Sequence, residues 1–169
     1  VALDGGPVFY GQKRMGKGGR TFLCWKFRTM SVNAEEALQC LIQSDPDIAR
    51  EWQSTQKLKF DPRVTRVGRW LRKTSVDELP QFFNVLNGTM SVVGPRPFAQ
   101  DQVVLYHPVV LCKYLAVKPG LTGSWQVYAR HDTTFECRAR FDQIYVEKAS
   151  FARDLALVIK TPLAMLKGS

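Results

Sequence analysis

The sequence has no long hydrophobic run, few side chains of the kind that bind zinc, and a shortage of acidic residues. Its longest apolar stretch, residues 155–166, is interrupted by Lys160 and Pro162, whereas a membrane-spanning helix needs about 18 consecutive apolar residues. Two histidines and four widely separated cysteines argue against a zinc cluster, and we expect the cysteines to be reduced thiols. A chain of 169 residues has the size of one domain, so we expect residues 1–169 to form a single domain.

The shortage of acidic residues leaves a net charge of +9, from 24 Lys and Arg against 15 Asp and Glu. The positive charge is concentrated in two segments, because residues 1–30 hold six basic residues and one acidic, and residues 57–76 hold seven and one. Residues 31–56, between them, are acidic. A domain with such basic segments usually faces an anion: a nucleic acid, a phosphorylated ligand or an acidic membrane surface.

Local sequence patterns predict an α/β (α+β) fold, in which a small antiparallel hairpin or sheet is packed by several short helices and helix dominates. Residues 8–13 and 21–27 favour β-structure, and the glycines between them favour a hairpin turn. Residues 90–93 favour a short strand, whereas Gly and Pro predict loops at 94–97 and 119–123. Apolar residues at helical spacing predict helices over residues 34–43, 46–53, 67–72, 79–86, 133–148 and 151–166.

Two acidic residues, Asp77 and Glu78, follow directly after the basic segment 57–76. One interpretation of this pair is structural. Acids favour the first turn of a helix, and Ser75 with Glu78 has the S-x-x-E spacing of a capping box.

The other interpretation of the acidic pair is catalytic. Arg69, Arg72 and Lys73 precede it, and a carboxylate held among cations stays ionised at neutral pH. Such a carboxylate at Asp77 could attack phosphorus, while the second carboxylate could hold a divalent metal or move a proton.

Further basic residues occur where a phosphate site could use them. Arg96 lies between two prolines in Gly-Pro-Arg-Pro, and a rigid backbone lowers the entropy lost when an arginine orders around a phosphate. Lys26 and Arg28 share one face of a predicted strand. A structural turn at Arg96 and a solvated sheet face at Lys26 and Arg28 are the alternatives.

Three segments together resemble the bacterial sugar transferase family, the monotopic polyprenol-phosphate phosphoglycosyl transferases. They are FYGQKRMGKGGRTFLCWKFRTM, DPRVTRVGRWLRKTSVDELPQFFNVLNGTMSVVGPRP and PGLTGSWQ, at residues 9–30, 61–97 and 119–126. The resemblance extends from about residue 6 to residue 168. A single tetrapeptide would carry little weight, but the ordered set with its spacing is specific.

The resemblance implies an activity and a location. Members transfer a sugar 1-phosphate from a UDP-sugar to undecaprenyl phosphate and release UMP, through a phosphosugar–aspartate intermediate and with Mg²⁺. The reaction begins the assembly of exopolysaccharide, capsule or O-antigen at the cytoplasmic face of the bacterial inner membrane. The implied partners are therefore a UDP-sugar, undecaprenyl phosphate and the membrane surface, with no nucleic acid.

The resemblance also implies roles for individual residues. Asp77 would be the nucleophile and Glu78 its partner, with both as candidate Mg²⁺ ligands. The residues implied in binding substrate phosphates are Lys26, Arg28, Arg72, Arg96 and Arg130. Asp142 and Asp154 would be polar residues near the site, although solvated helix acids are an equal alternative.

Family members carry a re-entrant membrane helix before the first strand, and the present sequence begins at Val1, a few residues before that strand. We therefore expect this chain to be a catalytic domain without its anchor. Residues 151–166 could lie at a membrane interface or pack as a closing helix. A nucleic-acid-binding module and an inactive scaffold domain are the competing functions. The first lacks interleaved aromatic and basic residues, and the intact acidic pair argues against the second.

Overall fold

A two-stranded hairpin forms the centre of the structure, a computed structural model that describes residues 5–55, 58–129 and 134–167. Strand β1 (Phe9–Met15) pairs antiparallel with β2 (Thr21–Phe27), from Phe9 opposite Phe27 to Met15 opposite Thr21. The connecting 3₁₀ turn, η1 (Lys17–Gly19), places Gly18 and Gly19 at φ of +69° and +75°, a region that glycine enters without strain. The predicted hairpin is confirmed.

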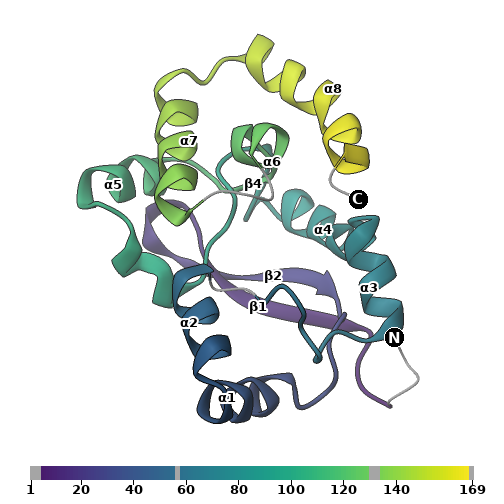
Figure 1. Cartoon of the computed structure of the whole chain (residues 1–169). Coiled ribbons are helices and arrows are strands. Elements are labelled where there is room, and N and C mark those ends of the chain that lie inside the picture. The colour runs from purple at the N-terminus through teal and green to yellow at the C-terminus, as the bar shows by residue number, and fades with distance from the viewer. Residues whose placement is uncertain (1–4, 56–57, 130–133, 168–169) are drawn as a thin grey trace.

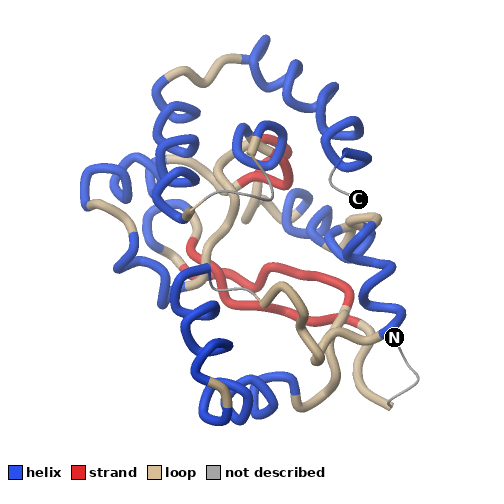
Figure 2. The backbone as a smooth tube through the Cα atoms, viewed as in Figure 1, coloured by secondary structure: helices blue, strands red, loops and turns tan. Residues whose placement is uncertain are grey.

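A second, much shorter sheet pairs β3 (Ser91–Val93) with β4 (Gly120–Thr122) in parallel (Figure 2). The strand at 90–93 was predicted, but the prediction of a loop at 119–123 is wrong. Glycine is disfavoured in strands, yet here it is required, because a Cβ on Gly120 would lie 2.1 Å from the backbone nitrogen of Gly94. The two strands therefore lie closer together than side chains at these positions would allow.

Helices cover the hairpin on several sides (Figure 1), and the helix-dominant class is confirmed. Helices α1 and α2 lie at the lower end of Figure 1, α3 and α4 beside the hairpin, and α6, α7 and α8 above it. The α-helices are α1 (Ala34–Ser44), α2 (Pro46–Thr55), α3 (Arg66–Lys73), α4 (Gln81–Leu86), α5 (Pro108–Ala116), α6 (Ser124–Tyr128), α7 (Phe135–Glu147) and α8 (Phe151–Lys167). Two further 3₁₀ segments are η2 (Val76–Glu78) and η3 (Gln100–Leu105).

The main buried cluster joins the end of the hairpin to the helices. It consists of Met15, Phe98, Tyr106, Tyr114 and Ala139. The ring centroid of Phe98 lies 4.6 Å from those of both Tyr106 and Tyr114, a spacing typical of stabilising aromatic pairs. Because Phe98 directly follows the Gly-Pro-Arg-Pro segment, this cluster fixes one end of that loop.

The predicted capping box at Ser75 and Glu78 is wrong. Ser75 has φ of +56° and makes no side-chain capping hydrogen bond, and a 3₁₀ turn rather than an α-helix follows it. The carboxylate of Glu78 instead binds cations from distant segments. Long-range ion pairs have overridden the local pattern, which describes only neighbours in sequence.

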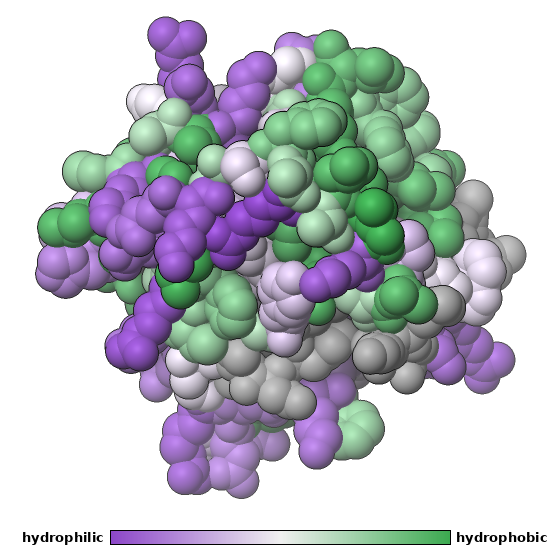
Figure 3. All heavy atoms as spheres, turned by 90° about the horizontal axis from the view of Figure 1, so that it is seen from above, coloured by the Kyte–Doolittle hydropathy of each residue, from purple (hydrophilic) through white to green (hydrophobic). Residues whose placement is uncertain are grey.

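Several large apolar side chains remain on the surface. In α4, Phe82, Phe83 and Leu86 are 51%, 61% and 82% exposed, and α8 exposes a further row that includes Leu155, Ile159 and Leu163. Figure 3 shows hydrophobic side chains gathered toward one side of the face seen from above, with hydrophilic ones toward the other. Within the described residues, none of the helices is both long and apolar enough to cross a membrane.

Helix α3 packs directly on the chain that leaves β2, and a glycine makes this contact possible. A Cβ on Gly68 would lie 2.0 Å from the carbonyl oxygen of Thr29. We expect Gly68→Ala to destabilise the fold by about 2–3 kcal/mol, because backbone must move to admit the methyl group. Thermal or denaturant unfolding measures the loss.

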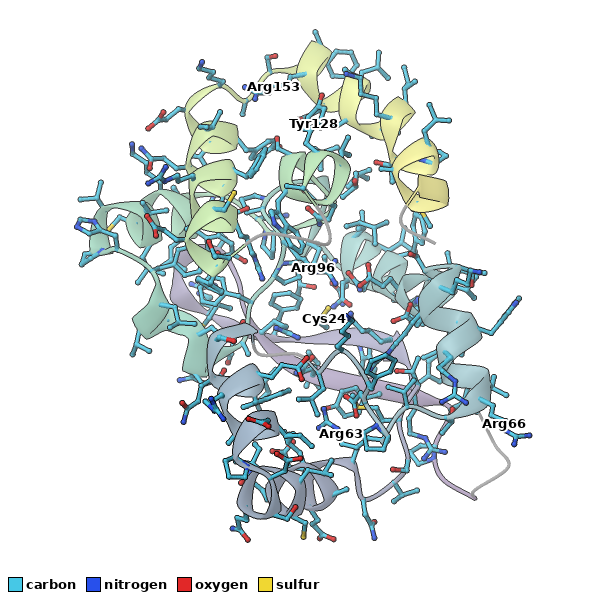
Figure 4. All side chains as sticks on the ribbon, viewed as in Figure 1. Cys24, Arg63, Arg66, Arg96, Tyr128 and Arg153 are labelled. Atoms are coloured by element: carbon cyan, nitrogen blue, oxygen red, sulfur yellow. The ribbon has the colours of Figure 1, made fainter. Side chains whose placement is uncertain are left out.

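Arg66→Ala is the control for this substitution. Arg66 is exposed on the same helix and points away from the protein (Figure 4), so its removal should change stability by less than about 0.5 kcal/mol. An equally stable Gly68→Ala protein would contradict the close packing of α3.

Candidate functional site

Glu78 joins three segments that are far apart in the sequence. Lys26, near the end of β2, donates from Nζ to Glu78 Oε1 at 2.9 Å. Arg96, from the Gly-Pro-Arg-Pro loop, donates from Nη2 to Oε1 at 2.6 Å and from Nη1 to Oε2 at 3.3 Å. Burial alone would raise the pKa of Glu78, but Arg96 and Lys26 outweigh it and hold the pKa well below its ordinary value.

Asp77, the adjacent acid, has the opposite electrostatic environment. Its side chain is buried, and burial raises its pKa above the ordinary 3.8, with repulsion from Glu78 adding to the shift. Lys26, Arg72 and Arg96 oppose this rise without cancelling it. Among the described residues, no hydrogen bond to the Asp77 carboxylate is recorded. Two neighbouring carboxylates with pKa values shifted in opposite directions are typical of a site where the two groups have different chemical roles.

Arg72 lies beside the acidic pair at the end of α3. Its Nε donates to Thr29 Oγ1 at 2.9 Å. Burial lowers the pKa of Arg72, while the charge of Asp77 raises it. Lys26, Arg72 and Arg96 are thus brought around the two acids, as expected for a phosphate site.

Arg28 contacts the segment that precedes β1. It follows the last residue of β2, its Nε donates to the carbonyl of Pro7 at 2.7 Å, and its guanidinium packs on Gly6, where a Cβ would lie 2.5 Å from Nη1. Its role in phosphate binding stays a prediction. Arg130 lies outside the described residues.

Asp142 and Asp154 each accept a hydrogen bond from a tyrosine. Tyr106 donates its hydroxyl to Asp142 Oδ2 at 2.8 Å, and Tyr145 donates to Asp154 Oδ1 at 3.0 Å. Asp142 is only 3% exposed, and burial raises its pKa to about 6. For Asp142 the alternative of a solvated helix acid is therefore wrong, and for Asp154 the tyrosine contact identifies a partner that the sequence did not reveal.

The sequence analysis missed two arginines near the site, Arg14 and Arg138. The pKa of Arg14 is lowered to about 10 by burial, with Arg96 and Arg138 adding to the effect. Both Arg96 and Arg138 lie over the ring of Trp125, with Cζ 6.0 Å and 5.4 Å from its centroid. Figure 4 places Arg96 in the interior, between the hairpin and α6. The alternation of side chains along the strand was the one feature of the sequence that could have pointed to Arg14.

The two acids are the metal ligands that this site offers. The described residues contain no group of three or more His, Cys, Asp or Glu side chains placed to hold a metal ion. In proteins Mg²⁺ is commonly bound by one or two carboxylates together with substrate phosphates and water. Asp77 and Glu78 therefore fit a Mg²⁺ ion shared with a bound diphosphate, and they do not form a complete protein cage.

The amino-acid sequence matches the family model of the bacterial sugar transferases over residues 1–168. The chain belongs to this family. The undecaprenyl-phosphate galactose phosphotransferase of Salmonella typhimurium is 48% identical over 167 residues, which make up 99% of this chain and 35% of that protein. The exopolysaccharide production protein ExoY of Rhizobium meliloti is 49% identical over 158 residues, or 94% of this chain and 70% of that protein.

A third relative is the UDP-glucose:undecaprenyl-phosphate glucose-1-phosphate transferase of Escherichia coli. It is 39% identical over 163 residues, which are 92% of this chain and 32% of that protein. The chain thus spans about a third of the length of the Salmonella and Escherichia coli relatives.

The opposite environments of the two acids predict opposite effects on stability. Since its raised pKa makes ionised Asp77 unfavourable in the folded state, Asp77→Asn should raise the unfolding temperature at pH 7–8. This difference should shrink as the pH falls through the raised pKa toward 3.8. Thermal unfolding across this pH range measures it.

Glu78→Gln is the matched variant. It removes the partner of Lys26 and Arg96, and we expect it to cost about 2 kcal/mol, less than the 3–5 kcal/mol of a fully buried pair. Because the pKa of Glu78 is lowered, this cost should be present above pH 4.5 and disappear as the pH falls through the lowered value. Equal and same-signed effects of the two variants would refute the assigned environments.

Proposed function

We propose that this protein transfers a sugar 1-phosphate from a UDP-sugar to undecaprenyl phosphate and releases UMP. The observation that carries the proposal is the adjacent pair of Asp77 and Glu78, with opposite pKa shifts, among Lys26, Arg72 and Arg96. The names of the relatives support the two substrates. The Salmonella and Escherichia coli proteins are named for undecaprenyl phosphate and for galactose or glucose.

In the first step, a carboxylate oxygen of Asp77 attacks the phosphorus that carries the sugar. The bond from that phosphorus to the bridging oxygen breaks, and UMP leaves with the bridging oxygen and its electron pair. The sugar phosphate is then bound to Asp77 as a mixed anhydride. Asp77 must be ionised for this attack, and its burial keeps water away from the anhydride.

In the second step, a phosphate oxygen of undecaprenyl phosphate attacks the same phosphorus. The bond to Asp77 breaks, the carboxylate is regenerated, and the product is a sugar diphosphate on the lipid. No proton or electron is gained or lost overall at Asp77. Because each step exchanges a carboxylate and a phosphate anion at the same phosphorus, the site needs chiefly orientation and neutralisation of charge.

Lys26, Arg72 and Arg96 supply that neutralisation. Arg96 presents a planar fork to Glu78 in this structure, and the same fork fits two oxygens of a phosphate. Glu78 orients Arg96 and Lys26 in the absence of substrate. Mg²⁺, held by Glu78 and Asp77 with the diphosphate, would neutralise the charge that develops on UMP as it leaves.

We further propose that the protein works at the cytoplasmic face of the bacterial inner membrane. The lipid acceptor is confined to a membrane, and the exposed apolar residues of α4 and α8 fit an interface between water and lipid. The positive net charge fits an anionic lipid surface.

The nucleophile is tested by Asp77→Asn in the intact protein, assayed by UMP release in detergent or lipid discs with undecaprenyl phosphate. The amide cannot form the anhydride, so we expect activity to fall by at least about 10⁴-fold. The donors are UDP-galactose and UDP-glucose, with UDP-galactose first because the Salmonella relative, at 48% identity, is named for galactose.

Asp47→Asn, an exposed acid on α2, is the control and should retain the full rate. A wild-type rate for Asp77→Asn would contradict the nucleophile assignment. Salt-dependent binding to DNA, with no UMP released from any UDP-sugar, would favour the nucleic-acid-binding alternative.

Metal removal is a separate test. We expect EDTA to stop turnover and added Mg²⁺ to restore it, because the site offers two carboxylates and would rely on the ion to neutralise the diphosphate. UMP release that persists after thorough chelation would show that the arginines and Lys26 suffice without a metal.

A further inference from the structure

The Gly-Pro-Arg-Pro loop has an unusual shortage of backbone hydrogen-bond donors. Pro95 and Pro97 have no N–H, so the N–H of Arg96 is the single backbone donor of residues 95–97. Neither a helix nor a strand includes these residues. Backbone hydrogen bonds reach Gly94 and Pro95, so the polar main-chain groups of Arg96 itself depend on side chains from other elements.

Three largely buried side chains lie around the Arg96 main chain. The Arg96 carbonyl oxygen accepts hydrogen bonds from Arg138 Nη2 at 2.6 Å and from the Tyr114 hydroxyl at 3.3 Å. Asp142, whose carboxylate lies near the Arg96 N–H, accepts from the Tyr106 hydroxyl at 2.8 Å and lies 3.9 Å from Arg138 Nε. Helices α5 and α7 thus contact the main chain of this residue, while its guanidinium binds Glu78.

Burying these charged groups costs more free energy than packing apolar side chains in the same place would cost. Asp142 is 3% exposed and the Arg138 side chain 11%, and their closest charged atoms are 3.9 Å apart. Burying such a pair costs several kcal/mol of desolvation per ion, and apolar residues of the same volume are often as stable. Among the described residues, the buried Nε of Arg138 also has no hydrogen-bond partner. A role in stability alone does not account for this arrangement.

We infer that Asp142 and Arg138 are positioning residues, which hold the Arg96 main chain so that its guanidinium meets Glu78 at two points. An arginine side chain has about 2 kcal/mol of rotamer entropy, and a mobile backbone would add to the disorder of its fork. When the Arg96 backbone is held in place, only the side-chain torsions remain to be fixed by Glu78 or a phosphate. The expected effect on the rate of UMP release rests on the proposed function, whereas the expected ordering of the Arg96 guanidinium does not.

The geometric part is tested by NMR of arginine side chains in ¹⁵N-labelled protein. The Arg96 guanidinium signals, assigned with Arg96→Lys, should be shifted and slow to exchange because Glu78 binds them. Asp142→Leu should abolish this protection. Asp142→Asn should keep it, since the amide oxygen still accepts from the Tyr106 hydroxyl and so keeps the side chain beside Arg138 and the Arg96 main chain. Unchanged Arg96 signals in Asp142→Leu would overturn the inference.

Arg138→Met provides a second route if Asp142→Leu does not fold. Methionine can keep the contacts with Trp125 and Phe135 but cannot donate to the Arg96 carbonyl. It should weaken the protection of the Arg96 guanidinium as well. Protection equal to that of the unmodified protein would contradict the role of Arg138.

The kinetic part is tested by a double-mutant cycle on UMP release in the intact protein. Asp142→Leu should lower kcat by about 10²-fold, the loss expected when a binding group is misplaced by about 1 Å. In an Arg96→Ala background the same substitution should cost less than about threefold, because its target is gone. Asp142→Asn should recover kcat to within about tenfold of the unmodified protein.

Asp61→Leu is the matched control, because the Asp61 side chain is 9% exposed and paired with an arginine, Arg63. It should lower the unfolding temperature, and any effect on kcat should be the same in the Arg96→Ala background, because Asp61 acts on Arg72 and not on Arg96. Additive losses in the cycle would overturn the positioning role. Absence of UMP release from the unmodified protein would instead refute the proposed function, and the NMR result would still decide the geometric inference.

Discussion

The ion pairs of Glu78 with Lys26 and Arg96 are the interaction on which the rest of the site depends. They connect the hairpin, the 3₁₀ turn η2 and the Gly-Pro-Arg-Pro loop, whose residues lie 52 and 18 positions from Glu78 in the sequence. The hairpin is held by its own antiparallel ladder, whereas the 3₁₀ turn and the Gly-Pro-Arg-Pro loop are short segments outside the sheets and α-helices. A single carboxylate with two cationic partners therefore sets their relative positions and brings together the side chains that surround Asp77.

The ion pairs of Glu78 influence the pKa of Asp77. Because Lys26 and Arg96 are largely committed to Glu78, they do not fully offset the burial of Asp77, whose pKa stays raised. A buried carboxylate whose surrounding cations do not offset its burial costs folding free energy, but under the proposed function it leaves Asp77 available to attack phosphorus. The folded protein is thus destabilised at Asp77 and stabilised at Glu78, a combination that is common in active sites.

The parts of the fold that depend on neighbours in sequence could be predicted, and those that depend on distant partners could not. The hairpin followed from glycines between two β-prone segments, and most of the helices from apolar spacing. The capping box failed because Glu78 binds Lys26 and Arg96 instead of its own backbone. Strand β4 was missed because its glycine, Gly120, allows a close backbone approach to Gly94 that only the folded structure reveals. Asp77 and Glu78 were identified as candidates, whereas their opposite pKa shifts were not, because burial dominates at Asp77 and the distant Arg96 and Lys26 dominate at Glu78.

The same close approach of the β3 and β4 backbones explains how the Arg96 loop comes to lie so deep in the protein. A Cβ on Gly123 would lie 2.1 Å from the carbonyl oxygen of Gly94, and one on Gly94 would lie 2.6 Å from that of Lys118. With no side chains between them, Gly94 donates to Thr122 at 2.9 Å and Gly120 donates to Pro95 at 2.8 Å. These backbone contacts anchor the loop before Arg96, and the aromatic cluster around Phe98 anchors it after. Arg96 itself lies between the two anchors, and within the described part of the chain no backbone group is hydrogen-bonded to it, which is why side chains from α5 and α7 are needed to hold it.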